Sequence, residues 1–170
     1  KYNKVAIASS NGIGKSKLLS ALAVWFFFCY LETDRRSNCI VVFTAPTFEQ
    51  VRVNIYNNVK EFIKTADDKL KQNFGDETLS LFGKLSDDKN RAEIIFNELS
   101  YMVGVTGSGE NKVVGKHGQY VLVIYDEAQG IENATFSDFN GITLSGDVIK
   151  QIMIGNTTLP EDKGNFGKFY

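Results

Sequence analysis

Hydrophobic residues along the chain gather into short apolar runs that polar segments separate. Runs of strand length lie at residues 4–8, 39–45, 120–125 and 148–154. The run at 39–45 does not alternate with polar residues, which is typical of a strand covered on both faces, as in a parallel sheet. Helical segments lie between the runs. The alternation therefore predicts an α/β fold with a mostly parallel sheet flanked by helices.

The most apolar segment is a helix expected to begin at Lys15. Residues 18–31 are apolar except for Ser20, so this helix is hydrophobic nearly all round and is expected to be buried. The consecutive aromatic residues 25–28 are interpreted as core. The run is too short to cross a bilayer, which requires about 20 residues. The beginning of the sequence also lacks the pattern of a signal peptide.

A second helix is expected after Pro46. Thr47 and Gln50 have the spacing of a capping box, and an apolar stripe predicts an amphipathic helix through about Ala66.

Beyond that helix the pattern is less regular. Residues 67–91 are polar and predict a helix tail, loops and one short strand near 79–82. Two apolar runs predict a β-hairpin over 92–105. A glycine-rich loop follows over 104–118, and a helix or loop is expected near 133–139.

Composition fits one globular domain. The chain has 170 residues, of which 43% are hydrophobic and 23% charged, with a net charge of -1. A chain of this size buries about 70% of its unfolded surface, so it needs no disulfide or metal for a core. Disorder, collagen-like repeats and a strongly basic tail are excluded.

Cys29 and Cys39 lie in apolar stretches and are expected to be buried free thiols.

Charge is unevenly distributed along the chain. Residues 1–64 carry nine Lys and Arg against four Asp and Glu, whereas residues 65–170 carry ten against sixteen. Contact with a polyanion would therefore have to use local patches.

The turn between the first strand and the first helix fits the phosphate-loop pattern G-x-x-x-x-G-K-[ST], except that serine replaces the first glycine. Such a loop points backbone N–H groups and the positive end of a helix dipole at phosphate. Its lysine would reach the β- and γ-phosphates and its last hydroxyl would bind Mg²⁺. The alternative is an ordinary turn with a solvated lysine. The predicted phosphate-binding residues are Ser9, Ser10, Asn11, Gly12, Ile13, Gly14, Lys15 and Ser16.

Two adjacent carboxylates, Asp126 and Glu127, follow the apolar run at 120–125. Ligands of parallel sheets bind at the carboxyl ends of strands. Asp126 could hold Mg²⁺ through water or Ser16, and Glu127 could orient and deprotonate an attacking water. The alternative is a solvated strand end that caps the next helix.

Four motifs together resemble the ATPase domain of the large terminase subunit, the DNA-packaging motor of tailed bacteriophages. They are residues 9–16, 44–47, 125–130 and 155–158, and they occur in the family's order. The resemblance implies a P-loop NTPase fold of the ASCE or RecA-like class over residues 1–170, as one domain of a longer chain. The stretch 164–170 resembles the segment after the last motif, and the family's nuclease domain would then be absent.

The resemblance also implies roles for individual residues. Lys15 and Ser16 would bind ATP and Mg²⁺, Asp126 would coordinate Mg²⁺, and Glu127 would be the catalytic carboxylate. Two residues, Asn156 and Thr157, would lie in the coupling motif that senses the γ-phosphate.

The implied activity is ATP hydrolysis that drives double-stranded DNA into a viral procapsid in the host cell cytoplasm. The implied partners are a portal protein, a small terminase subunit and further copies in a homo-oligomeric ring, without a membrane.

The chain departs from the family in two places. Many relatives carry an arginine within the phosphate loop, where this chain has Ser10 and Asn11. Arg91 and Arg52 are the candidate arginine fingers, from the same or a neighbouring subunit, and solvated surface is the alternative for both. Only residues 1–4 remain of the family's adenine-contacting segment, so weaker nucleotide affinity or base selectivity is expected.

Two other functions stay open. A helicase-type nucleic-acid ATPase is one, because residues 44–47 also resemble a strand-contacting motif there. A non-catalytic nucleotide-binding module that docks on a portal is the other.

Three loop residues before the strand at 120–125 are also candidates for contact with phosphate or DNA, and a solvated loop is the alternative. They are Lys112, Lys116 and His117.

Overall fold

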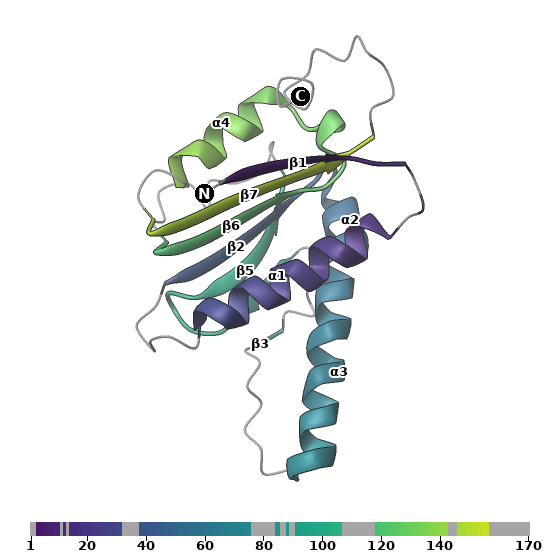
Figure 1. Ribbon diagram of the computed structural model, residues 1–170, viewed down its shortest axis with the longest axis vertical. Coiled ribbons are helices and arrows are strands. Elements are labelled where there is room, and N and C mark those ends of the chain that lie inside the picture. The colour runs from purple at the N-terminus through teal and green to yellow at the C-terminus, as the bar shows by residue number, and fades with distance from the viewer. Residues whose placement is uncertain are drawn as a thin grey trace.

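The computed structural model describes residues 3–10, 12, 14–31, 38–75, 84–85, 88, 91–106, 118–142 and 146–156. Within this part of the chain, seven strands form one sheet in the order β1-β7-β6-β2-β5-β4-β3 (Figure 1). The strands are β1 (Lys4–Ala8), β2 (Cys39–Thr44), β3 (Lys84–Leu85), β4 (Ala92–Ile95), β5 (Tyr101–Val105), β6 (Tyr120–Tyr125) and β7 (Val148–Gly155).

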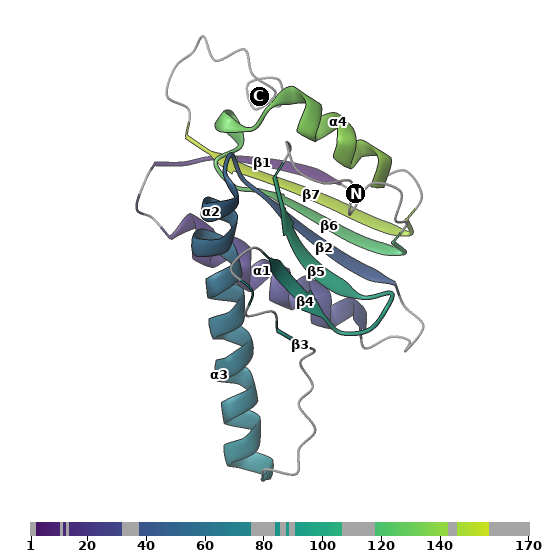
Figure 2. The same ribbon diagram turned by 180° about the vertical axis from the view of Figure 1, so that it is seen from behind.

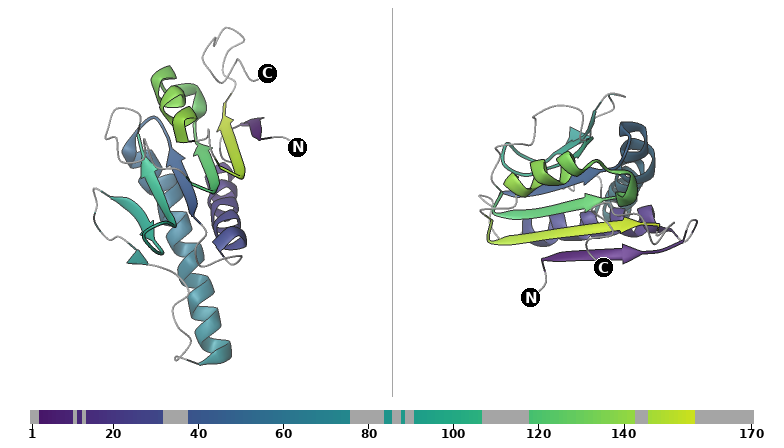
Figure 3. Two further views of the ribbon diagram at one scale, coloured as in Figure 1. Left: turned by 90° about the vertical axis from the view of Figure 1, so that its left-hand side faces the viewer. Right: turned by 90° about the horizontal axis from the view of Figure 1, so that it is seen from above.

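The sheet is mostly parallel, as predicted. Strands β1, β7, β6, β2 and β5 run parallel to one another, whereas β4 pairs antiparallel with β5 and β3 antiparallel with β4. The pairing of β4 with β5 confirms the hairpin expected over 92–105. The strand expected near 79–82 lies outside the described residues. Strand β1, which is far from β7 and β6 in the sequence, lies side by side with β7, and β7 with β6, in the right view of Figure 3.

Helices cover both faces of the sheet. Helix α1 (Lys15–Leu31) lies in front of the sheet in Figure 1 and behind it in Figure 2. With α3 (Asn57–Phe74) it packs on alternate residues of β2, such as Val41 and Phe43. Helix α4 (Asn133–Ile142) packs on the other set, such as Ile40 and Val42. All six side chains of β2 are therefore buried, which explains its unbroken apolar sequence.

The helix expected through about Ala66, with a helix tail beyond it, continues to Phe74. It begins as α2 (Phe48–Gln50), passes through a π-helical turn η1 (Val51–Tyr56) and continues as α3 to Phe74. Beyond Ile63 its side chains leave the core, and its far end projects past the sheet (Figure 3). An ion pair of 2.9 Å between Lys71 and Asp67 supports this exposed part.

The expectation that α1 is buried nearly all round is wrong. Phe26 and Phe27 are buried, but the Trp25 side chain is 59% exposed. The cause is that α1 packs on the sheet with one face and on α3 with one flank, so its outer face meets solvent. Cys29 is exposed for the same reason, contrary to the prediction, whereas Cys39 is buried in β2, and both thiols are free. In the described part of the chain, no helix combines the length and apolarity needed to cross a membrane.

Candidate active site

The candidate phosphate loop connects β1 to α1. Its first residue, Ser9, donates its backbone N–H to the carbonyl oxygen of Gly155 at 3.0 Å, and its hydroxyl is buried without a hydrogen-bond partner in the described residues. Gly12 and Gly14 have φ angles of 78° and 83°, which side-chain-bearing residues rarely adopt. The exposed Ser10 lies in the same loop. The backbone conformation of the loop therefore depends on these two glycines. Two predicted loop residues, Asn11 and Ile13, lie outside the described residues.

Lys15, the first residue of α1, points to the end of β7. Its Nζ donates to Oδ1 of Asn156 at 2.6 Å and to the carbonyl oxygen of Ser9 at 3.5 Å. The pairing of β1 with β7 explains this contact, because Ala8 and Gly155 are partners in the register. The strand order thus brings together two predicted residues that are 141 positions apart.

Ser16 and Asp126 form the second contact of the site. The Ser16 hydroxyl donates to Oδ2 of Asp126 at 3.1 Å, and Asp126 is 1% exposed. Burial raises the pKa of Asp126 and nearby Glu127 adds to this, whereas the hydrogen bond from Ser16 and the charge of Lys15 oppose it. The ionised Asp126 carboxylate therefore lacks enough nearby positive charge to offset the cost of its burial. The pair therefore offers two oxygen ligands where a divalent cation would lower the electrostatic cost.

Glu127 has an unusual backbone conformation. Its φ of 49° and ψ of 46° place it in the left-handed region, and among the described residues it is the only non-glycine with a positive φ. This conformation costs about 1–2 kcal/mol for a residue with a side chain. It turns the chain sharply after β6 into the short 3-10 turn η2 (Ala128–Gly130). The two adjacent carboxylates consequently have different surroundings.

The carboxylate of Glu127 is held by Gln50, which the sequence did not suggest as a site residue. Nε2 of Gln50 donates to Oε2 of Glu127 at 2.8 Å. Gln50 is fixed by the predicted capping box, in which its Oε1 accepts the Thr47 N–H at 3.0 Å. The spacing of Thr47 and Gln50 signalled the cap. It did not signal that the other end of the Gln50 amide reaches Glu127.

Gln129 is the second residue that the sequence missed. Its Oε1 accepts the backbone N–H of Asn156 at 3.2 Å. A Cβ atom at Gly155 would lie 2.3 Å from the same oxygen, so the Gln129 amide occupies the space that a side chain at 155 would need.

Among the described residues, neither candidate arginine finger forms a hydrogen bond or ion pair with this cluster. Arg91 precedes β4 and pairs with Asp88 at 3.7 Å, with 58% of its side chain exposed. Arg52 is half-buried in η1. The coupling residue Thr157, the loop residues Lys112, Lys116 and His117, and the stretch 164–170 lie outside the described residues.

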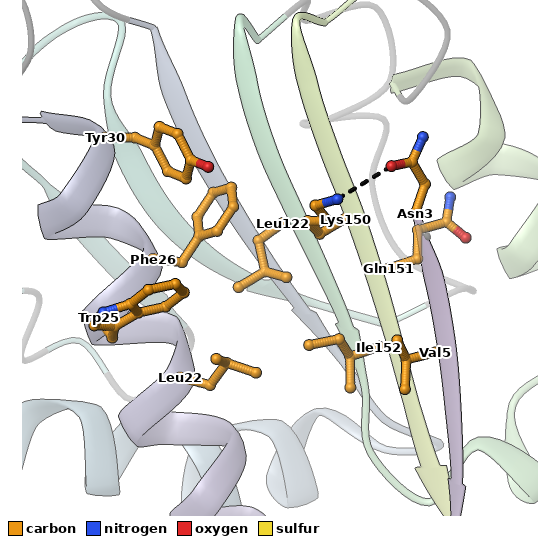
Figure 4. A pocket seen from close by; sticks show the side chains of 10 residues that line it. All are labelled: Asn3, Val5, Leu22, Trp25, Phe26, Tyr30, Leu122, Lys150, Gln151 and Ile152. Atoms are coloured by element: carbon orange, nitrogen blue, oxygen red, sulfur yellow. Dashed lines mark hydrogen bonds between the residues drawn. The ribbon is translucent and has the colours of Figure 1, made fainter. Parts of the chain in front are cut away.

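A cavity of about 220 Å³ lies at a different place, between α1 and the edge of the sheet (Figure 4). Apolar side chains such as Val5, Trp25 and Ile152 line it, and Nζ of Lys150 donates to Oδ1 of Asn3 at 3.2 Å beside them. None of the candidate site residues lines this cavity. The candidate site is therefore defined by its polar contacts at the strand ends.

Several solved structures with a similar fold are large terminases of bacteriophages. The large terminase of a thermophilic bacteriophage has a TM-score of 0.68 at 14% identity over 99% of this chain. The isolated ATPase domain of the Thermus phage P74-26 large terminase has a TM-score of 0.61 at 17% identity over 92% of this chain. This chain has the fold of a large-terminase ATPase domain. The HK97 bacteriophage large terminase matches at a TM-score of 0.60 and 14% identity over 90% of this chain.

The terminase structures are longer than this chain. The match spans 37% of the large terminase of the thermophilic bacteriophage, 29% of the HK97 protein and 60% of the P74-26 ATPase domain. The large terminase of the thermophilic bacteriophage in complex with ADP also matches, with a TM-score of 0.56 at 9% identity over 90% of this chain and 33% of that one. No protein-family model and no curated protein matches the sequence.

Proposed function

We propose that this chain is the ATPase domain of a bacteriophage large terminase subunit and hydrolyses ATP to drive double-stranded DNA into a viral procapsid. The observation that carries the proposal is the cluster of Lys15, Ser16, Asp126, Glu127 and Asn156 at the carboxyl ends of β1, β6 and β7. Sites in open parallel sheets form at these ends. The terminase-like fold of the described residues supports the same assignment.

The residues present fit a nucleotide with a divalent cation. Two glycines with positive φ allow the loop to wrap a phosphate, and the N-terminus of α1 favours a negative group. Ser16 and Asp126 would hold Mg²⁺, which when bound neutralises charge on the β- and γ-phosphate oxygens. The similar terminase that was solved with ADP supports nucleotide binding at this fold.

The proposed hydrolysis uses Lys15 and Glu127, which in the structure are hydrogen-bonded to Asn156 and Gln50. Lys15 leaves Asn156 for a γ-phosphate oxygen, where its charge stabilises the transition state. Glu127 orients a water and accepts its proton as the oxygen of that water bonds to the γ-phosphorus. The bond between the γ-phosphorus and the bridging oxygen breaks, and ADP leaves with that oxygen.

The biological setting remains part of the proposal. A homo-oligomeric ring would surround the DNA and dock on a portal protein, with a small terminase subunit as a further partner, in the cytoplasm of the infected cell. Arg91 or Arg52 would complete the site from the same or a neighbouring subunit. The whole chain, residues 1–170, would form one ATPase domain, with Thr157 and the loop residues Asn11 and Ile13 completing the site.

Two variants with matched controls test the proposal. Lys15→Ala should weaken nucleotide affinity at least roughly tenfold in calorimetry, because a charge-assisted contact to phosphate is lost. Lys17→Ala, at an exposed position in the first turn of α1, should leave the affinity unchanged. Glu127→Gln should retain nucleotide binding and lose at least roughly a hundredfold in hydrolysis. Glu132→Gln, at an exposed position, is its control. Unchanged affinity in Lys15→Ala, or normal turnover in Glu127→Gln, contradicts the proposal.

A further inference from the structure

Gln129 connects the end of β7 to the segment that carries Glu127. It lies in η2, two residues after Glu127, and its side chain reaches back to accept the Asn156 N–H. The side chain of the same asparagine accepts a hydrogen bond from Lys15. Asn156 is therefore held from two sides, through its side chain by the candidate phosphate-binding lysine and through its backbone by Gln129.

The Gln129 side-chain amide packs tightly against Gly155. It lies against Gly155 on the side where a Cβ would be only 2.3 Å from Oε1, and the next neighbour of that Cβ, the backbone nitrogen of Ala128, would be 3.4 Å away. Gly155 is also bonded through its carbonyl oxygen to Ser9 of the loop. The amide thus contacts a part of β7 that is tied directly to the phosphate loop.

The segment between Gln129 and Glu127 has little freedom. The Gly130 N–H donates to the Glu127 carbonyl oxygen at 2.9 Å, and Glu127 itself is in the left-handed conformation. A displacement of Asn156 that moves Gln129 is therefore passed to Glu127 over a short, hydrogen-bonded turn. Such a displacement is expected when Lys15 exchanges Asn156 for a phosphate oxygen.

We propose that Gln129 is a positioning residue that sets the placement of Glu127 according to whether Lys15 is bound to Asn156 or to phosphate. The inference rests on the proposed ATPase function. It assigns Gln129 no contact with nucleotide, so its loss should affect turnover and leave nucleotide affinity nearly unchanged.

Two independent variants remove the contact. Gln129→Met keeps the length of the side chain but has no oxygen to accept the Asn156 N–H. Gly155→Ala keeps Gln129 but places a methyl group where its amide lies, and only the end of a flexible side chain must move. Each should lower kcat roughly tenfold and leave the nucleotide Kd within about twofold, as for a residue coupled through one hydrogen bond. Gln72→Met, at an exposed position on α3, is the matched control.

A double variant separates positioning from general support of the fold. Asn156→Ala keeps the backbone N–H that Gln129 binds but removes the side chain that Lys15 binds. If Gln129 acts through Asn156, adding Gln129→Met to Asn156→Ala should lower kcat by less than about twofold more. Independent, multiplicative losses would overturn the inference, as would kcat within about twofold of wild type in both Gln129→Met and Gly155→Ala.

The wild-type chain and Glu127→Gln, assayed in parallel, identify which idea fails. Hydrolysis that is insensitive to Glu127→Gln refutes the proposed function and the inference with it. Hydrolysis that depends on Glu127 but not on Gln129 or Gly155 refutes the inference alone. Thermal melting of each variant reports whether a loss of turnover follows a loss of fold.

Discussion

The contact between Lys15 and Asn156 predicts that a stronger hydrogen bond between these two side chains weakens nucleotide binding. Nζ of Lys15 lies 2.6 Å from Oδ1 of Asn156, and under the proposed function nucleotide phosphates would compete for the same Nζ. Removing the competitor with Asn156→Ala should therefore tighten the binding of ADP. The choice of ADP matters, because ADP has no γ-phosphate for Asn156 to contact.

The expected magnitude follows from the environment of the pair. A hydrogen bond to a charged group contributes about 1.5–3 kcal/mol net. Both side chains are only half-buried, so water replaces part of the contact and a value of about 1–1.4 kcal/mol is reasonable. Because 1.4 kcal/mol corresponds to a factor of ten, the Kd for ADP should fall about five- to tenfold in Asn156→Ala.

The complementary variant should act in the opposite direction. Asn156→Asp replaces a neutral acceptor by a carboxylate, which strengthens its contact with Lys15 and repels phosphate, so the Kd for ADP should rise. Isothermal titration calorimetry at fixed salt measures both variants without requiring turnover. Weaker ADP binding in Asn156→Ala, or equal effects of the two variants, would refute the competition.

Two predictions concern the fold. Burial raises the pKa of Cys39 to about 12, so a thiol reagent at pH 8 should label the exposed Cys29 in the native protein and Cys39 only after denaturant is added; equal native labelling of both would contradict the described burial. Gly104→Ala should destabilise the protein by about 1–3 kcal/mol in urea titration, since its Cβ would lie 2.4 Å from Cγ1 of Val51 and 2.8 Å from Cβ of Ala92; a change below about 0.5 kcal/mol would show that the core relaxes around it.

The elements were predictable because local signals agreed with the fold. The unbroken apolar sequence of β2 matches a strand with helices on both faces, and the spacing of Thr47 and Gln50 matches the capping box that opens α2. Burial around α1 was not predictable in the same way. The sequence of α1 is apolar all round, but its outer face stays open because no described element covers Trp25. Whether a helix side chain is buried depends on the neighbouring elements, which the hydrophobic pattern of the helix itself does not specify.

The π-helical turn η1 had no signal in the sequence but has a structural partner. Ser20 of α1 is fully buried, and its hydroxyl lies 2.7 Å from the carbonyl oxygen of Ser16 and 3.2 Å from that of Ile55 in η1. Carbonyl groups that leave the regular helix pattern need donors from elsewhere. The helix that carries Lys15 is thus joined by a polar contact to the helix that begins at Phe48 and contains Gln50. Gln50, which holds Glu127, and the helix that follows the candidate phosphate loop consequently belong to one packed unit.

The parts of the site that sequence reasoning missed depend on strand order and register. Alternating elements place Lys15, Asp126 and Asn156 after separate strands, but they do not say which strands are neighbours. In the observed order, β7 lies between β1 and β6, with Gly155 level with Ala8 and Met153 level with Tyr125. Strand β7 therefore extends beyond the last paired residue of β6, and the turn after Glu127 lies beside its end. Any order that separated β7 from either neighbour would break one of the two contacts of Asn156, either that with Lys15 or that with Gln129. Because β7 lies between β1 and β6, Asn156 is hydrogen-bonded both to Lys15 of the candidate phosphate loop and to Gln129 of the turn that follows Glu127.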